Sequence, residues 1–96
     1  MTLYAGERTL KGSLVTADGA PLPDGRAIKL FSRTGFEWGF EGPGPRQLAL
    51  AMLLHHLNDP AQALALSQPL MQQVIATLDN AWQMTGEELS TTLQAL

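Results

Sequence analysis

The sequence predicts an α+β fold, with a small N-terminal antiparallel sheet of three or four short strands packed on about three C-terminal helices. Eight of the nine glycines lie before position 45, which is typical of short strands joined by tight turns. Long apolar stretches suited to helices follow that position. The chain has 96 residues, 45% of them apolar, so it can fill one core but is too short for a cleft enzyme built from two domains.

We therefore expect one domain over residues 1–96. Strands and turns are expected mainly in residues 1–44, and helices mainly in residues 45–96. The Gly-Pro-Gly-Pro sequence at 42–45 joins the two parts, and no internal repeat suggests another division.

The strands are expected in the following order. Residues 4–10 form the weaker candidate near the N-terminus. Residues 14–17 form a strand that ends at Asp18-Gly19, because this dipeptide supplies the positive φ angles of a tight hairpin turn. A short returning strand over residues 20–22 follows.

Two prolines limit this returning strand. Pro21 and Pro23 have no N–H to donate to a ladder, so the stretch belongs at the edge of the sheet or just outside it. After a second turn at Asp24-Gly25, residues 27–31 alternate in polarity and are predicted to form a further strand.

The first helix is expected over residues 46–57. Pro45 suits its first turn, where the missing N–H would be unpaired anyway. The run 48–54 is apolar on all sides, which predicts a helix covered on most sides at the centre of the core.

A second helix is expected over residues 61–66, because Asp59-Pro60 combines an N-cap acid with a proline at the first helical position. Pro69 is expected to kink or restart this helix, with Ser67 as a new cap. Apolar residues then recur at helical spacing at Leu70, Met71, Val74, Ile75 and Leu78.

The last helix is expected to begin after Thr85. Thr85 and Glu88 have the spacing of a capping box, in which each side chain bonds the backbone of the other residue. Leu89, Leu93 and Leu96 then form one apolar stripe.

The net charge of −3 is unevenly distributed. Residues 1–46 carry +1, whereas residues 47–96 carry −4 and contain no Lys or Arg. The six basic residues are Arg8, Lys11, Arg26, Lys29, Arg33 and Arg46. An acidic half without cations repels a phosphate backbone, so nucleic acid is not the expected partner.

The chain has no cysteine, and therefore neither disulfides nor thiolate metal ligands, which favours a cytoplasmic protein. The first residues lack the pattern of a signal peptide. The longest apolar run is far shorter than the roughly 18 residues that span a membrane, so we expect no membrane association.

The densest motif covers residues 35–45. One interpretation is structural: Phe36, Trp38 and Phe40 alternate along a strand and pack on the helices, while glycines permit a bulge and a tight entry to the helix. The residues given this structural role are Gly35, Phe36, Gly39, Phe40, Gly42, Gly44 and Pro45.

The other interpretation makes the motif a partner-binding site. Trp and Arg are enriched at the hot spots of protein interfaces. The candidate contact residues are Arg33, Glu37, Trp38, Glu41 and Arg46.

Catalytic, cofactor and metal sites are not expected. On a strand, Glu37 and Glu41 would lie about 13 Å apart, too far for a pair of glycosidase carboxylates. His55 or His56 with Asp59 gives at most half of a metal site, and the chain has no thiol nucleophile.

Residues 34–54 resemble a family of unknown function found in phages, plasmids and bacterial genomes, whose members read Gly-Phe-Glu-Trp-Gly-Tyr, a glycine-rich turn, Gly-Pro and Gln-Leu-Ala-Leu-Ala. Weaker matches extend over nearly the whole chain. This chain departs from the family at Phe40, where tyrosine is common, and at Glu41 and Pro43, which make its turn stiffer and more acidic. The resemblance implies a phage or plasmid setting and no established activity.

The leading hypothesis is a non-catalytic accessory protein of a phage, mobile element or bacterial host. It would act by binding another protein, such as a component of a host defence system, in the manner of an anti-CRISPR or anti-restriction protein. One alternative is a nucleic-acid-associated module that uses Arg26, Lys29 and Arg33. The other is a small-ligand or enzyme domain centred on Glu37 and Trp38.

Overall fold

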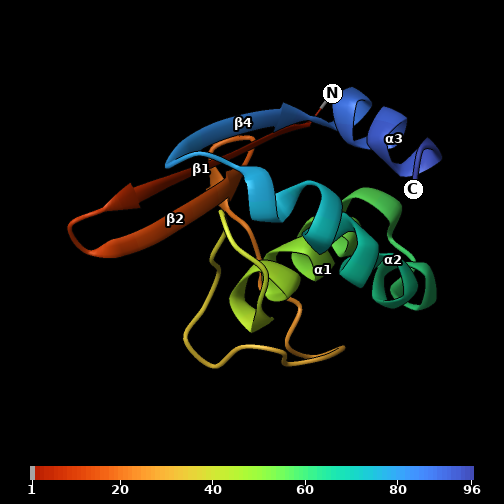
Figure 1. Ribbon diagram of the computed structural model, residues 1–96, viewed down its shortest axis with the longest axis horizontal. Coiled ribbons are helices and arrows are strands. Elements are labelled where there is room, and N and C mark those ends of the chain that lie inside the picture. Colours follow the sequence, from red (N-terminus) through yellow and green to blue (C-terminus); the bar gives the residue numbers. More distant parts are fainter. Residues whose placement is uncertain (1) are drawn as a thin grey trace.

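The computed structural model describes residues 2–96 (Figure 1). In chain order the elements of these residues are β1 (Leu3–Thr9), β2 (Gly12–Ala17), β3 (Ala20–Pro21), α1 (Pro43–Leu57), α2 (Pro60–Gln73), the 3₁₀ helix η1 (Ile75–Thr77), β4 (Ala81–Thr85) and α3 (Gly86–Gln94). The strands form one antiparallel sheet in the order β3-β2-β1-β4. The predicted α+β class, a small antiparallel sheet with three helices, is confirmed.

The N-terminal hairpin forms where the sequence predicts it. β1 pairs with β2, and β2 then turns into the short edge strand β3. Asp18 and Gly19 have φ angles of 52° and 83°, as this tight turn requires. The Asp18 carboxylate also accepts the backbone N–H of Leu3 at 2.8 Å, which ties the turn to the start of β1.

No strand was predicted over Ala81–Thr85, yet this segment forms β4, which pairs with β1. Trp82 and Met84 are buried, whereas Ala81 and Gln83 are exposed. This period of two is the signal of a half-buried strand, and only five residues between two helices carry it. One edge of the sheet therefore comes from the C-terminal half of the chain.

α1 and α2 lie on one side of the sheet, α3 lies beyond the end of β4, and the other face of the sheet is open (Figure 1). The inner face carries the buried side chains Tyr4, Val15, Ala17, Trp82 and Met84. The outer face carries Ala5, Glu7, Leu14, Thr16 and Gln83. Within residues 2–96, no helix has the length and apolar character needed to cross a bilayer.

α1 is the central helix, as its sequence predicts. It begins at Pro43, slightly earlier than expected, and Pro45 lies in its first turn. Residues 48–53 are all buried, because the sheet, α2 and the preceding loop surround them. Gln47, directly before this apolar run, is also buried although its side chain is polar.

α2 begins as predicted, with the Asp59 side chain accepting the N–H of Gln62 at 3.3 Å. The expected restart at Pro69 is wrong, because the helix continues through Pro69 to Gln73. Ser67 does not cap a new helix. Its hydroxyl donates to the carbonyl of Leu64 at 2.8 Å, within the same helix.

The predicted capping box is present at the start of α3. Glu88 N–H donates to the Thr85 hydroxyl at 3.1 Å, and Thr85 N–H donates to the Glu88 carboxylate at 3.1 Å.

The helical spacing expected through Leu78 holds only in part, since α2 ends at Gln73 and η1 follows.

The strand predicted over residues 27–31 is wrong. The N–H groups of Ile28 and Lys29 both donate to the carbonyl of Gly25, so this segment forms a local turn rather than a ladder. It belongs to a loop over residues 22–42 that contains no helix or strand. Figure 1 shows this loop, coloured orange to yellow, extending from the sheet around the start of α1.

Candidate functional site

The side chain of Gln47 fixes the first part of the long loop. Its amide oxygen accepts the N–H groups of Phe31 at 2.6 Å and Ser32 at 3.1 Å. Its amide nitrogen donates to the carbonyls of Asp24 at 2.6 Å and Lys29 at 3.1 Å. Since Gln47 is fully buried, these four bonds replace the water that its amide would otherwise bind.

This arrangement holds the intervening residues on the outside of the molecule. The five residues 26–30 are all exposed, including Ile28 at 40% and Leu30 at 43%. Arg33, close by in the sequence, is also exposed. We call residues 26–30 together with Arg33 the loop surface.

Arg46 packs beside this surface without pointing freely into solvent. Its guanidinium lies 4.1 Å from the centre of the Phe31 ring, and its Nε donates to the Ser67 hydroxyl at 3.2 Å. Arg46 was predicted to contact a partner, and in the structure it joins the loop to α1 and α2.

Arg8 of β1 fixes the second part of the loop. Its guanidinium donates to the carbonyl of Trp38, lies 4.8 Å from the centre of the Trp38 ring, and pairs with the Glu37 carboxylate at 3.4 Å. It also donates to the side chain of Asn80, just before β4. One cation therefore connects the loop, the central strand and the edge strand.

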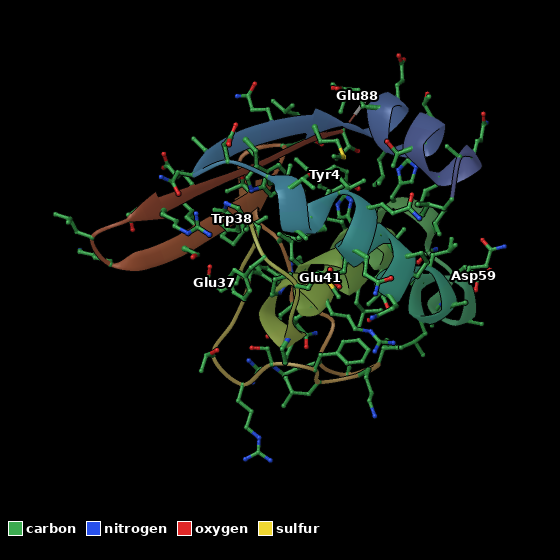
Figure 2. The ribbon with its side chains drawn as sticks, viewed as in Figure 1. Tyr4, Glu37, Trp38, Glu41, Asp59 and Glu88 are labelled. Atoms are coloured by element: carbon green, nitrogen blue, oxygen red, sulfur yellow. The ribbon has the colours of Figure 1, made fainter. Side chains whose placement is uncertain are left out.

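Trp38 is completely buried, although it was predicted as a partner contact (Figure 2). Its indole N–H donates to the Asp79 carbonyl at 2.7 Å, and its ring meets that of Trp82 edge to face at 5.9 Å between centres. A side chain with no exposed area cannot contact a partner in this conformation, so the partner-binding surface has to be built without Trp38.

The predicted strand alternation of Phe36, Trp38 and Phe40 is also wrong. Gly35 and Gly39 have φ angles of 96° and 87°, which turn the chain twice within five residues. Phe40 is consequently 50% exposed, whereas Phe36 packs partly buried against the core.

The rest of the motif forms the entry to α1. Gly42 is the N-cap, and Gly44 and Pro45 are buried in the first turn. A Cβ on Gly44 would lie 2.8 Å from Cβ of Glu37, so glycine lets these two segments meet. Glu41 is exposed and lies two residues before the start of α1 (Figure 2).

Gly6 and Trp82 form a close contact under the sheet. They are paired across β1 and β4, and a Cβ on Gly6 would overlap the Trp82 indole. The Trp82 indole N–H is buried without a hydrogen-bond partner among the described residues. Glycine at this position therefore admits the ring that contacts Trp38.

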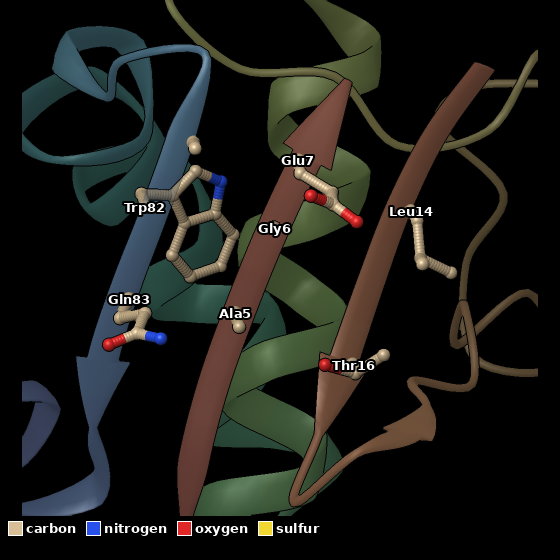
Figure 3. Close-up of a pocket in the computed structure, with 8 residues that line it drawn as sticks. Ala5, Gly6, Glu7, Leu14, Thr16, Trp82 and Gln83 are labelled. Carbon is tan, nitrogen blue, oxygen red and sulfur yellow. The ribbon is translucent and has the colours of Figure 1, made fainter. Parts of the chain in front are cut away.

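The outer face of the sheet is hollowed into a shallow groove of about 560 Å³ (Figure 3). Small side chains on adjacent strands, among them Ala5 and Ala81, form its floor. Its polar side chains are Glu7 of β1, Thr16 of β2 and Gln83 of β4.

The histidines are used within the fold. Tyr4 OH and His55 Nδ1 lie 2.9 Å apart, and His56 Nε2 and the Ser90 hydroxyl lie 2.8 Å apart. Burial, and secondarily the negative charge of Asp18, raises the pKa of Tyr4 to about 12. Among residues 2–96, no three His, Cys, Asp or Glu side chains lie close enough together to hold a metal ion.

Intramolecular contacts occupy three of the six basic side chains. Arg8 and Arg46 are held as described above, and Arg26 pairs with Asp24 at 2.8 Å. This pair lowers the pKa of Asp24, through the hydrogen bonds and charge of Arg26. Lys29 and Arg33, both in the loop surface, form no ion pair within the part of the chain that the structure describes.

The geometry defines a small α+β domain with a pinned loop over one side of α1 and an open sheet face on the other side. A family model described as a family of unknown function, DUF6166, matches residues 4–95, so the chain belongs to this family. No curated protein and no solved structure is similar enough to match the chain.

Three residues that organise this region were not predicted to do so. Gln47 could have been singled out as the polar residue directly before a long apolar run. Arg8 and Trp82 give no comparable local signal, because their roles depend on contacts with residues about 30 or more positions away.

Proposed function

We propose that this protein acts by binding another protein through the loop surface, without catalysing a reaction. The observation that carries the proposal is that Gln47 holds two exposed apolar side chains, Ile28 and Leu30, in one conformation. Loops longer than about 12–15 residues without secondary structure are uncommon in small domains and are often functional.

Ordering a loop in advance favours binding. A flexible loop loses conformational entropy when a partner fixes it, and a pinned loop has already lost that entropy on folding. The four hydrogen bonds of Gln47 therefore support a binding role better than a connecting role, since a connector needs no fixed shape.

The composition of the loop surface indicates the class of partner. Ile28 and Leu30 offer apolar contact area, and Lys29 and Arg33 are cations without an intramolecular partner in the described chain. A protein with an apolar patch bordered by carboxylates would complement this surface.

An accessory role in a phage, a mobile element or a bacterial host fits this proposal. Binding to a host defence component, in the manner of an anti-CRISPR or anti-restriction protein, is the specific form that we favour. It is supported by the small acidic chain and by the genomic setting that the family resemblance implies.

The test is affinity capture from a bacterial lysate, followed by calorimetry with the purified partner. Ile28→Ser combined with Leu30→Ser should weaken binding at least about tenfold, equivalent to about 1.4 kcal/mol. Lys29→Glu combined with Arg33→Glu should weaken it further at low salt.

Leu10→Ser is the matched control, because Leu10 is a fully exposed leucine in the turn between β1 and β2. It should bind like the wild type. Equal binding by all variants, or equal loss in the Leu10 variant, would remove the loop surface as the binding site.

A further inference from the structure

The sheet has one unprotected edge, which is strand β4. β4 lies at the end of the strand order and contains no proline and no charged residue. The opposite edge strand, β3, has only two residues, and Pro21 is one of them. Charged residues, prolines and short length are the usual protections of an edge strand, so β4 is the edge that can accept another strand.

The register identifies the backbone groups that are free on β4. Arg8 N–H donates to the Asn80 carbonyl, and Gly86 N–H donates to the Thr2 carbonyl. Because bonded and non-bonded pairs alternate in an antiparallel ladder, Ala81 and Gln83 point their N–H and C=O groups away from β1. Both residues are exposed, and these four groups form no hydrogen bond within residues 2–96.

This free edge has defined ends. On one side, the Asp79 carbonyl accepts the Trp38 indole N–H at 2.7 Å. On the other side, the Thr85 N–H is bonded to the Glu88 carboxylate. The open edge therefore has room for a short extended peptide that pairs with Ala81 and Gln83.

The charges around the edge indicate what can pair with it. Asp79 precedes β4, Glu87 follows it, and Glu7 lies on the outer face opposite Ala81. All three are exposed, and none forms an ion pair in the described chain. Pairing with a second copy would gather two sets of these carboxylates around one short ladder, and the nearby cation, Arg8, is already paired with Glu37, so this pairing is unfavourable.

We propose that the free edge of β4 binds an extended peptide segment that carries Lys or Arg, which adds a fifth strand to the sheet. Glu7 lies on the next strand inward, about 10 Å from an added strand at the usual strand spacing. Ala81 between them has only a methyl group, and it belongs to the groove in Figure 3. A long basic side chain can therefore cross Ala81 to reach Glu7.

The test titrates the protein with two synthetic peptides that alternate Val and Thr around a central pair of Lys or a central pair of Glu. Binding is followed by nuclear magnetic resonance of the backbone amides. The Lys peptide should shift the amides of Ala81 and Gln83 and slow their hydrogen exchange, and it should bind at least about tenfold more tightly than the Glu peptide.

Two variants and one control variant test the site. Gln83→Pro removes an N–H that points away from β1, so the existing ladder is kept, and it should abolish binding. Glu7→Gln should remove the preference for Lys over Glu and keep the amide shifts. Gln83→Thr retains the N–H and should bind like the wild type, which separates loss of the N–H from loss of the glutamine side chain.

Equal binding of both peptides, shifts confined to the loop surface, or no binding at all would overturn the proposal. Concentration-dependent dimerisation through β4, measured by analytical ultracentrifugation, would overturn it in favour of a second copy. The loop surface takes no part in this experiment. Its failure would therefore leave the proposal of protein binding through the loop surface unaffected.

Discussion

The two parts of the loop between β3 and α1 differ in their exposure to solvent. Residues 26–30 are exposed, whereas Trp38 is fully buried and Phe36 and Glu37 are partly buried. The buried part has the more distinctive sequence, with glycines, a tryptophan and a glutamate in close succession. A dense motif can therefore mark where a loop must fit against the fold, while the plainer stretch beside it stays exposed.

The largest expected effect comes from Trp38→Ala. This change removes a fully buried ring that contacts Arg8 and Trp82, so it should lower the free energy of unfolding by about 3–5 kcal/mol. Urea denaturation measures it. Phe40→Ala is the control for an aromatic of the same motif that is half exposed, and it should cost less than about 1 kcal/mol. Equal losses would contradict the assignment of Trp38 to the interior.

The pH dependence of stability tests the inner face at Tyr4. Its pKa is about 12 in the folded protein and near 10 when exposed, so the folded state retains the proton through this range. The free energy of unfolding should therefore be independent of Tyr4 below pH 10 and fall by up to about 3 kcal/mol as the pH rises to 12.

Tyr4 is the only tyrosine, so phenolate absorbance reports this group alone. The Tyr4→Phe variant should lack this part of the alkaline decrease. A titration midpoint near 10 would show that Tyr4 is open to water.

Gly6→Ala tests the contact under the sheet. The new methyl group would overlap the Trp82 indole, so we expect a loss of about 1–3 kcal/mol in thermal or urea denaturation. Ala5→Ser, one residue away on the outer face, should change stability by no more than about 0.5 kcal/mol. A neutral Gly6 variant would mean that Trp82 can move without loss.

The smallest expected effect on stability belongs to the loop surface. Ile28→Ser and Leu30→Ser alter side chains that are already about two-fifths exposed, so each should shift the free energy of unfolding by less than about 1 kcal/mol. A larger loss would place these side chains in the core and count against their proposed role as partner contacts.

Local signals were sufficient for much of the fold. Asp18-Gly19, Asp59-Pro60 and the pair Thr85 and Glu88 specify turns and caps through bonds to near neighbours, and all three were predicted. The α+β class followed from the division of glycines and apolar runs.

Contacts between distant residues could not be predicted from such signals. The segment 27–31 alternates like a strand, but Lys29 and Phe31 within it bond to the side chain of Gln47, which lies 18 and 16 positions further along the chain. They do not bond to another strand. The direction of Trp38 depends on Arg8 and Asp79, which lie 30 and 41 positions away. Of the predicted contact residues, Trp38 is therefore buried, whereas Arg33 and Glu41 are exposed.

Amide hydrogen exchange at Phe31 and Ser32 tests the central claim, that Gln47 holds the loop in one shape. Both N–H groups donate to Gln47, whereas those of Ala27 and Leu30 donate to no group within the described chain. In the wild type, Phe31 and Ser32 should exchange at least about tenfold more slowly than Ala27 and Leu30, and Gln47→Leu should remove this difference while β1 stays protected. Equal exchange at all four amides in the wild type, or unchanged protection in the variant, would contradict the account.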